Sequence, residues 1–273
     1  MPDHSDLGDR MKKYEAAWDA NLMPFVPAIA RLDGKAFHTF TRGLERPYDQ
    51  RLSTLMVETT RFLVGDLGAC IGYTQSDEIS LVWFVEKIGT ELPFDGRTLK
   101  LASILAAKAS VYFNKRLPDL LPEKIGQSPV FDCRVFSVPT QTEAANCILW
   151  RELDATRNSI SMAAQACFSH NQLMGKNCDE MQEMLFQEKG INWNDYPSFF
   201  KRGTYIQKRV VERPFTSDEI DKLPPKHAAR TNPDLKIWRT DYRVLDLPPI
   251  TKITNREAVI FAGAEPVVAG EQK

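Results

Sequence analysis

The sequence lacks any apolar run near the ~20 residues that a helix needs to span a bilayer, so we expect no membrane association. It also lacks an excess of charge, because 35 basic residues are balanced by 36 acidic ones. This balance argues against a uniformly basic surface for nucleic acid, although a local basic stripe is still compatible with it. The polar first stretch, MPDHSDLGDRMKKYE, has no apolar core and is not typical of a signal peptide. We expect a cytoplasmic location.

Paired cysteines are missing as well. The five cysteines include no Cys-x-x-Cys pair, and most lie within apolar runs. This pattern is typical of buried free thiols in a reducing compartment. No internal repeat or low-complexity tract divides the chain, and 273 residues, of which 43% are hydrophobic, suffice for one large domain or two small ones.

The first half of the chain alternates between strand-like and helix-like patterns. Continuous or alternating apolar residues predict strands, and apolar residues at helical spacing predict helices. The predicted elements are a strand at 25–32, a helix at 49–68 capped by Asp49 and stopped by Gly68, hairpin strands at 69–75 and 78–84, a helix at 96–116 before Pro118, and a strand at 130–139. This βαββαβ order predicts an α+β, ferredoxin-like fold, in which a four-stranded antiparallel sheet carries both helices on one face.

The second half has a different character. Residues 141–189 have a mainly helical pattern, and after Gly190 aromatic, basic and turn-forming residues mix. Prolines punctuate short extended runs beyond residue 216. This composition predicts an irregular C-terminal extension with one or two strands, which could be an arm for another subunit or a ligand.

Acidic residues fall where the predicted strands end. Asp33 follows the first strand, and Asp77 and Glu78 lie at the tip of the hairpin. In a βαββαβ sheet the first strand lies beside the hairpin, so Asp33 and Asp77 can approach each other. Two carboxylates without a neighbouring cation repel unless a hard cation lies between them, and carboxylates with a backbone carbonyl suit Mg²⁺. Two such ions can support in-line displacement at phosphorus.

Asp77 and Glu78 are not expected to be equivalent ligands, because adjacent side chains of an extended chain point to opposite faces. We expect Asp77 to be the direct ligand and Glu78 to support it. The alternative is that Ser76 and Asp77 simply start a turn, in which both residue types are common.

A phosphate-bearing ligand would also need hydrogen-bond donors. The turn GKAFH at 34–38 follows Asp33, and its backbone N–H groups can surround a phosphate, although it lacks the pattern of a P-loop. Side chains that could add positive charge, each alternatively a solvated surface charge, are Arg46, Arg97, Lys100, Lys201 and Arg202.

Six motifs between residues 25 and 205 share their order with one known family. They are RLDGKAFHTF, ERPYDQR, GYTQSDEIS, FDCRV, WRELDATRNS and FKRGT. With them the sequence resembles the tRNA-histidine guanylyltransferase family. The resemblance implies a polymerase-palm sheet, with a palm-like catalytic core at 1–140 and a helical segment plus C-terminal extension at 141–273 that complete the same domain. It also implies 3′–5′ nucleotide addition to a tRNA 5′ end activated by a nucleoside triphosphate, two Mg²⁺ ions, GTP and ATP as substrates, and a homotetramer.

The resemblance also implies roles for individual residues. Asp33, Asp77 and Glu78 would be catalytic, with Asp33, Asp77 and the carbonyl of Gly34 as metal ligands. The nucleotide would meet Gly34, Lys35, Ala36, Phe37, His38, Arg46, Asp49, Ser76, Arg97 and Lys100. The tRNA or a triphosphate would meet Arg134, Asp154, Asn158, Lys201, Arg202, Lys208 and Arg209. Their shared task would be electrostatic clamping of the transferring phosphoryl groups.

One departure from the family pattern bears on the substrate. Histidine-tRNA-specific members carry His-Ile-Asn-Asn-Leu-Tyr after the WRxxD motif, whereas this sequence has TRNSIS at 156–161. In the ERPYD motif, Arg46 and Tyr48 stand where relatives often have Lys and Asn, which keeps the charge but alters donor geometry. The departure favours the guanylyltransferase-like branch of bacteria, archaea and phages, which resembles template-dependent 5′-end repair enzymes.

Three alternatives remain open from the sequence. One is addition of the −1 G to histidine tRNA, and another is a palm-type nucleotidyl cyclase. The third is a non-enzymatic RNA-binding module that stacks bases on Trp83, Phe84 or Phe136; strand aromatics are more often core, and acids repel phosphate. RNA could also meet the basic-aromatic stretch 199–209 or the basic segment 226–243.

Overall fold

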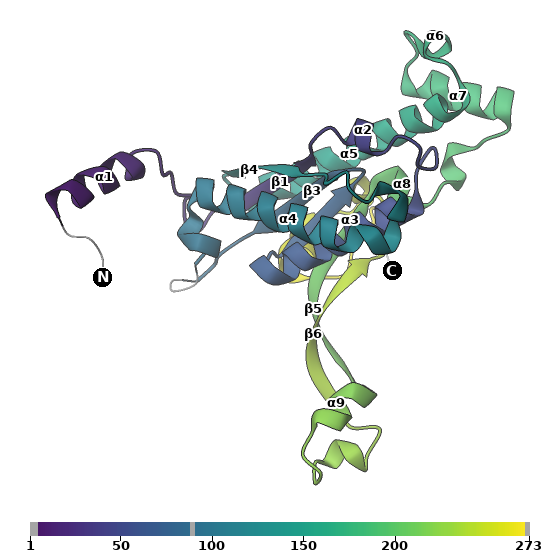
Figure 1. The fold of residues 1–273 in the computed structure, drawn as a ribbon. Helices are drawn as coiled ribbons and strands as arrows, with labels where there is room; N and C mark the ends of the chain where they lie inside the picture. Colours follow the sequence, from purple (N-terminus) through teal and green to yellow (C-terminus); the bar gives the residue numbers. More distant parts are fainter. Residues whose placement is uncertain (1–4, 88–90, 271–273) are drawn as a thin grey trace.

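The computed structural model describes residues 5–87 and 91–270. Its centre is an antiparallel sheet of six strands in the order β4-β1-β3-β2-β5-β6 (Figure 1). The strands are β1 (Ala28–Gly34), β2 (Ile71–Gln75), β3 (Glu78–Trp83), β4 (Phe131–Ser137), β5 (Thr204–Pro214) and β6 (Lys236–Leu245). The order of β1 to β4 confirms the ferredoxin-like prediction, and β5 and β6 extend the sheet beyond the predicted four strands.

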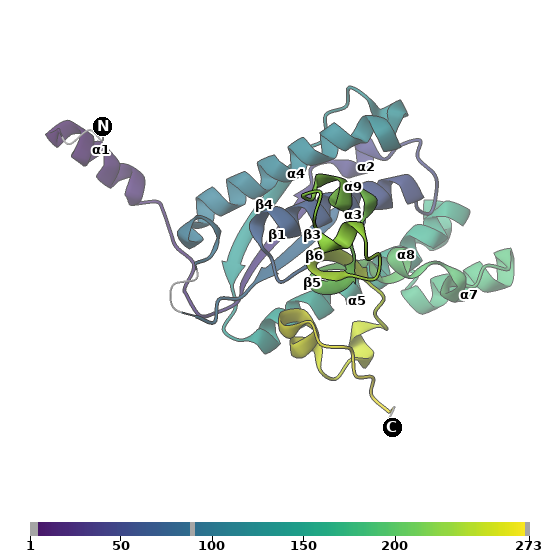
Figure 2. The same ribbon diagram turned by 90° about the horizontal axis from the view of Figure 1, so that it is seen from below.

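Two helices cover one face of the sheet, as predicted. They are α3 (Gln50–Leu67) and α4 (Thr98–Leu120), which pack against each other and against the strands (Figure 1, Figure 2). The carboxylate of Asp49 caps α3 by accepting the N–H of Arg51, and Gly68 ends the helix in the left-handed conformation. The fully buried core between helices and sheet includes Leu32, Leu55, Leu63, Ile79, Leu105 and Phe113.

Helix α4 is longer than predicted. It continues through Pro118 to Leu120 because the buried side chains of Leu117 and Leu121 hold its last turn against the core. A proline in a last turn removes only one donor, and the N–H of Leu121 still donates to the carbonyl of Leu117 at 2.8 Å.

A long helix covers the opposite face. Helix α5 (Gln141–Cys167) packs its apolar side against the sheet and forms a second core. That core includes Ile29, Ile71, Tyr73, Val82, Ala144, Ile148 and Tyr205. The βαββαβ pattern does not imply this second layer, yet α5 carries one wall of the site described below.

Shorter elements complete the body. The helices are α2 (Phe37–Phe40), α6 (His170–Leu173), α7 (Cys178–Lys189) and α8 (Ser198–Arg202). The helical turns are η1 (Pro93–Gly96), η2 (Pro122–Lys124), η3 (Trp193–Asp195), η4 (Ala228–Arg230), η5 (Ile250–Lys252) and η6 (Ala258–Ala262).

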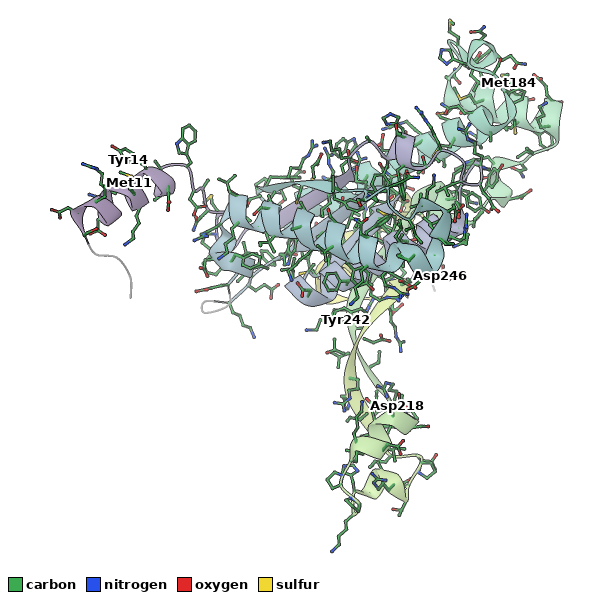
Figure 3. The ribbon with its side chains drawn as sticks, in the orientation of Figure 1. Met11, Tyr14, Met184, Asp218, Tyr242 and Asp246 are labelled. Carbon is green, nitrogen blue, oxygen red and sulfur yellow. The ribbon has the colours of Figure 1, made fainter. Side chains whose placement is uncertain are left out.

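The predicted irregular extension contains a long two-stranded arm. Strands β5 and β6 pair from Tyr205 and Leu245 to Pro214 and Lys236. The start of β5 also pairs with β2 in the sheet, and the outer part of the two strands projects away from the body (Figure 1). Tyr242 lies near the base of this arm, and α9 (Ser217–Lys222), which contains Asp218, lies near its tip (Figure 3).

Helix α1 (Asp6–Ala16) also projects from the body, and none of its residues is buried (Figure 1). Within residues 5–87 and 91–270, no helix has the length and apolar character needed to cross a membrane. All five cysteines are free, as predicted. They are half-buried, whereas the sequence predicted buried thiols.

Candidate functional site

The predicted acids meet at one end of the sheet. Asp33 on β1 lies opposite Glu78 on β3 and opposite Asp132 on β4, and the N–H of Gly34 donates to the carbonyl of Asp77 at 3.1 Å. Directly opposite residues of an antiparallel pair point to the same face. Glu78, Asp33 and Asp132 therefore form a row of carboxylates, with Asp77 held beside it by the hairpin turn.

Unlike Glu78, neither Asp33 nor Asp77 forms an ion pair with a described residue. The Asp77 carboxylate accepts a hydrogen bond from the hydroxyl of Ser76 at 3.1 Å and another from its own backbone N–H. Burial raises the pKa of Asp77, and the charge of Asp33 raises it further. Mutual repulsion of two uncompensated carboxylates is the electrostatic condition that a divalent cation relieves.

The donors present fit Mg²⁺. Within the described part of the chain no group of three or more His, Cys, Asp and Glu side chains surrounds a metal position. Mg²⁺ is commonly bound by one or two carboxylates and completes its shell with water and substrate phosphate. Asp33, Asp77 and the carbonyl of Gly34 are such a set.

Glu78 is engaged elsewhere. Its two carboxylate oxygens accept hydrogen bonds from the Arg151 guanidinium at 2.6 and 2.8 Å, and the two side chains are only 10% and 9% exposed. Burial raises the pKa of Glu78, and Arg151 opposes that rise. Arg151 also donates to Asp154 at 2.8 Å. The pair therefore fastens the first residue of β3 to α5.

The turn at 34–38 is suited to an anion. Ala36 is in the left-handed conformation with φ of 57°, and the N–H groups of Ala36, Phe37 and His38 donate to no described residue. Successive unpaired N–H groups of this kind form a concave anion-binding nest. Phe37 anchors the turn, because its ring is 2% exposed and packs against Phe113. A Cβ at Gly34 would lie 2.4 Å from that ring, which requires glycine there.

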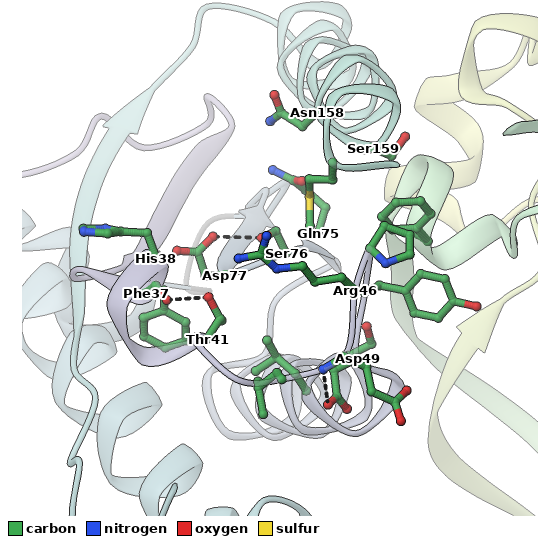
Figure 4. A pocket seen from close by; sticks show the side chains of 18 of the residues that line it. Phe37, His38, Thr41, Arg46, Asp49, Gln75, Ser76, Asp77, Asn158 and Ser159 are labelled. Atoms are coloured by element: carbon green, nitrogen blue, oxygen red, sulfur yellow. Dashed lines mark hydrogen bonds between the residues drawn. The ribbon is translucent and has the colours of Figure 1, made fainter. Parts of the chain in front are cut away.

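A cavity of about 620 Å³ opens between this turn, the segment 41–53, the hairpin tip and α5 (Figure 4). Arg46 extends into it toward Ser76 and Asp77, and it forms no ion pair with a described residue (Figure 4). Asp49 also lines the cavity, but its carboxylate is bound by Arg51 at 2.8 Å, which lowers the pKa of Asp49. Asp49 is thus committed to capping α3.

A second hollow of about 320 Å³ lies on the α5 side of the acids. The two hollows share Asp33, Gln75, Ser76, Asp77, Asn158, Met162 and Gln165. The acidic pair therefore stands between two spaces, and each could hold part of a substrate.

Most of the predicted nucleotide residues line these hollows. The first is lined by Asp33, Gly34, Ala36, Phe37, His38, Arg46, Asp49, Ser76, Asp77 and Asn158, and the second also by Glu78 and Asp154. Lys35 lines neither. Because Phe37 is a core residue, only its backbone is available to a nucleotide.

Arg97 and Lys100 lie far from the acids within one chain. Strand β3 runs away from the acids, so α4 begins at the far end of the sheet, where Arg97 pairs with Asp19 at 3.3 Å. Lys100 lies on the first turn of α4, over the ring of Phe94. Within one chain neither side chain reaches the cavity.

The remaining predicted contacts are dispersed. Arg134 is exposed on β4, Asp154 accepts from Arg151 and Arg157, and Arg202 lies on α8. Lys201 donates to the carbonyl of Asn194, and Lys208 and Arg209 lie on β5, where Arg209 donates to the carbonyl of Gly263.

Trp83 is wrong as a stacking platform for RNA, because it is 3% exposed and its indole N–H donates to the carbonyl of Leu67. Phe84 packs edge-on against Phe261, and Phe136 is 37% exposed.

Four residues at the site were not predicted as such. Asp132 and Gln75 adjoin Asp33 and the hairpin tip, and Arg151 lies within the WRELD motif. Gln165 follows Asn158 by seven residues, which places both side chains on the same side of a helix, and this spacing could have identified Gln165 from the sequence.

Comparison with known proteins identifies the family. The model of the Thg1 family, tRNAHis guanylyltransferase, matches residues 8–139. A tRNA(His) guanylyltransferase of Debaryomyces hansenii is 30% identical over 216 residues, which are 73% of this chain and 79% of that protein. A protein of Acanthamoeba polyphaga mimivirus is 32% identical over 228 residues, which are 76% and 78% of the two chains.

A solved structure of a bacterial protein has a similar fold and sequence. The bacterial tRNA(His) guanylyltransferase (Thg1)-like protein in complex with ATP superposes with a TM-score of 0.75 and 38% identity, over 93% of this chain and 97% of that one. The chain belongs to the tRNA(His) guanylyltransferase family. The family predicted from the six motifs is confirmed, and its members are nucleotidyltransferases. The shared fold extends well beyond residue 139, where the family model ends.

Proposed function

We propose that the protein is a template-dependent 3′–5′ nucleotidyltransferase that repairs the 5′ end of tRNA. The observation that carries the proposal is the pair Asp33 and Asp77, neither of which forms an ion pair with a described residue, beside an anion-binding turn in a cavity of about 620 Å³. Pockets of this size hold small-molecule ligands such as nucleotides. The relatives solved with ATP and with GTP support both as substrates.

The residues of the site would divide the work. Asp33, Asp77 and the Gly34 carbonyl would hold Mg²⁺, which when bound neutralises phosphoryl oxygens and activates the attacking oxygen in a two-metal reaction. The N–H groups of residues 36–38 would orient a triphosphate, and Arg46 would stabilise charge that develops on the transferring phosphoryl group. Glu78, through Arg151, would fix the hairpin tip against α5.

The reaction has two steps. First the 5′-phosphate of the RNA attacks the α-phosphorus of a nucleoside triphosphate, and pyrophosphate leaves. The 3′-hydroxyl of the incoming nucleotide then attacks the activated 5′-phosphate, and the nucleoside monophosphate leaves. Both steps are in-line displacements that depend on positioning and charge neutralisation rather than on a covalent enzyme group.

The chain resembles the solved bacterial guanylyltransferase-like protein more than the solved tRNA(His) guanylyltransferase of yeast. The bacterial guanylyltransferase-like structure with ATP is 38% identical and covers 93% of this chain. The Saccharomyces cerevisiae tRNA(His) guanylyltransferase structure is 25% identical, covers 71% of this chain and has a TM-score of 0.63. The stretch 156–161, which departs from the histidine-tRNA-specific pattern, lies on α5, and its residues Asn158, Ser159 and Ser161 line the hollows beside the acids.

The test is a panel of tRNAs that lack the 5′ nucleotide, each incubated with Mg²⁺ and one nucleoside triphosphate at a time. We expect addition of the nucleotide complementary to the opposite base on every tRNA tested. Addition of G regardless of the opposite base, and confined to histidine tRNA, would replace the proposal with −1 G addition. A cyclic product from GTP alone would identify a cyclase.

We also propose that the chain assembles as a homotetramer through α1. The exposed side of this helix carries Leu7, Met11 and Tyr14, which are 58%, 41% and 65% exposed (Figure 3). An isolated helix of 11 residues is marginal in water and needs a packing partner. Light scattering should give four chains for the wild type and fewer for Met11→Glu; a wild type with fewer than four chains would refute the proposal.

A cytoplasmic location remains part of the proposal. It is supported by the five free cysteines, which suit a reducing compartment. Fractionation of the source cells should recover the protein with cytoplasmic markers, and recovery in an oxidising compartment would contradict it.

A further inference from the structure

Lys124, the last residue of η2, is a buried lysine that lines neither hollow beside the acids. Only 5% of it is exposed. It forms no ion pair with a described residue; its ammonium donates instead to the carbonyl of Arg42 at 2.6 Å and lies 5.6 Å from the centre of the Phe40 ring. Lysine is rarely buried unless it is paired, because its charge loses water. Here the cost of burial is offset by one backbone carbonyl and one aromatic ring.

The carbonyl that Lys124 binds belongs to the segment that carries Arg46. Residues 41–49 connect α2 to α3, and all of them except Gly43 line the cavity of about 620 Å³. Arg46 extends from this segment toward the hairpin tip and forms no ion pair with a described residue (Figure 4). The direction of its side chain is therefore set by the backbone on either side of it.

The same helical turn also holds the other end of the segment. Glu123 pairs with the Arg51 guanidinium at 2.7 Å, and Arg51 pairs with Asp49 at 2.8 Å. The Asp49 carboxylate in turn accepts the N–H of Glu45 at 3.3 Å. Glu123 and Arg51 are 42% and 43% exposed, and ion pairs between exposed side chains contribute little. The buried contact of Lys124 is therefore the stronger of the two.

We propose that Lys124 is a positioning residue for Arg46. Through the Arg42 carbonyl it holds the segment 41–49 in the conformation that directs the Arg46 guanidinium at a bound triphosphate. The inference rests on the proposed function, in which Arg46 meets the transferring phosphoryl group. A hydrogen bond from an ammonium is stronger than one between neutral groups. A guanidinium that is already in place loses less conformational freedom when the phosphate binds.

The experiment measures nucleotide binding without RNA. Isothermal titration calorimetry with ATP and Mg²⁺ gives the dissociation constant for the wild type, Lys124→Met, Arg46→Met and the double variant. Lys124→Gln is measured in parallel, so that a second replacement is available if Lys124→Met does not fold. An NMR titration with adenosine, which has no phosphate, is the second readout.

Leu105→Ala is the control for a general loss of stability. Leu105 is fully buried on α4, toward the end of that helix that lies away from η2, so its truncation destabilises the core without touching the segment 41–49. All variants are compared below the melting temperature of the least stable one.

We expect Lys124→Met to weaken ATP binding about five- to tenfold and adenosine binding less than about twofold. Arg46→Met should weaken ATP binding about ten- to a hundredfold, and the double variant should bind ATP no more weakly than Arg46→Met. Lys124→Gln should follow Lys124→Met, and Leu105→Ala should bind ATP like the wild type.

Three results would overturn the inference. They are unchanged ATP binding in the Lys124 variants, multiplied losses in the double variant, and a loss for adenosine or in Leu105→Ala as large as that of Lys124→Met for ATP. Addition to truncated tRNAs by the wild type, measured in parallel, tests the proposed function separately. Its absence beside the expected ATP affinities would refute the proposed function and leave the role of Lys124 supported.

Discussion

The ion pair between Glu78 and Arg151 gives a prediction whose size follows from the structure. Arg151→Met removes the guanidinium and leaves the Glu78 carboxylate, 10% exposed, without its ion-pair partner. Breaking a buried pair from one side costs about 3–5 kcal/mol, because a charge remains uncompensated in a low-dielectric site. Asp154 also loses a partner, but it is 27% exposed and keeps Arg157 at 2.8 Å. Most of the loss should therefore come from Glu78.

Urea unfolding followed by circular dichroism measures this loss. The matched control is the double variant Glu78→Gln with Arg151→Met, which has no buried charge left at this position. Replacing both partners of a buried pair is often nearly neutral, so we expect the double variant to recover most of the stability. The reasoning is refuted by a single variant within about 1 kcal/mol of the wild type, or by a double variant no more stable than the single one.

Other positions carry shorter predictions. Burial raises the pKa of Glu152 above its usual 4.5, so the folded state binds this proton more tightly than the unfolded state does. Protonation of Glu152 therefore stabilises the folded state at low pH, and that contribution is lost as pH rises through the raised pKa. Glu152→Gln should gain urea stability relative to the wild type between about pH 4 and pH 8, and a constant difference would contradict this. Gly203 has φ of 76° and a Cβ there would lie 2.6 Å from the Thr74 carbonyl oxygen, so Gly203→Ala should lower thermal stability by about 1–3 kcal/mol, whereas an unchanged melting temperature would show that the site relaxes. Arg46→Met should raise the KM for the nucleoside triphosphate about ten- to a hundredfold without loss of stability. Arg97→Met, at the far end of the sheet, should leave this KM unchanged. Equal effects of the two variants on KM would argue that Arg46 does not touch the triphosphate.

The parts of the fold that the sequence predicts well depend on local patterns. Asp49 and Gly68 bound α3 as predicted, because capping and left-handed stops use residues next to one another in the chain. The meeting of Asp33 with Asp77 also follows, since the βαββαβ order alone makes β1 a neighbour of β3.

The parts that could not be predicted depend on distant contacts. Glu78 and Arg151 are 73 residues apart, and nothing in the ferredoxin-like pattern places α5 across the free face of the sheet. The second hollow, which α5 lines, arises from the same packing. The distance of Arg97 from the acids within one chain has a different cause: the direction of β3 fixes which end of α4 faces the acids, and helical spacing alone does not give that direction.

Nucleotide addition as a function of Mg²⁺ concentration tests the central claim most directly. A labelled nucleotide and a tRNA lacking its 5′ nucleotide are incubated with the wild type, Asp33→Asn, Asp77→Asn or the control Asp66→Asn, whose aspartate pairs with Lys108 away from the site. We expect Mg²⁺-dependent addition by the wild type and the control, and a loss of about a thousandfold or more in the two site variants, all with unchanged circular dichroism. Addition by either site variant within about tenfold of the wild-type rate, or addition by the wild type in EDTA, would contradict the assignment of Asp33 and Asp77 as the metal site.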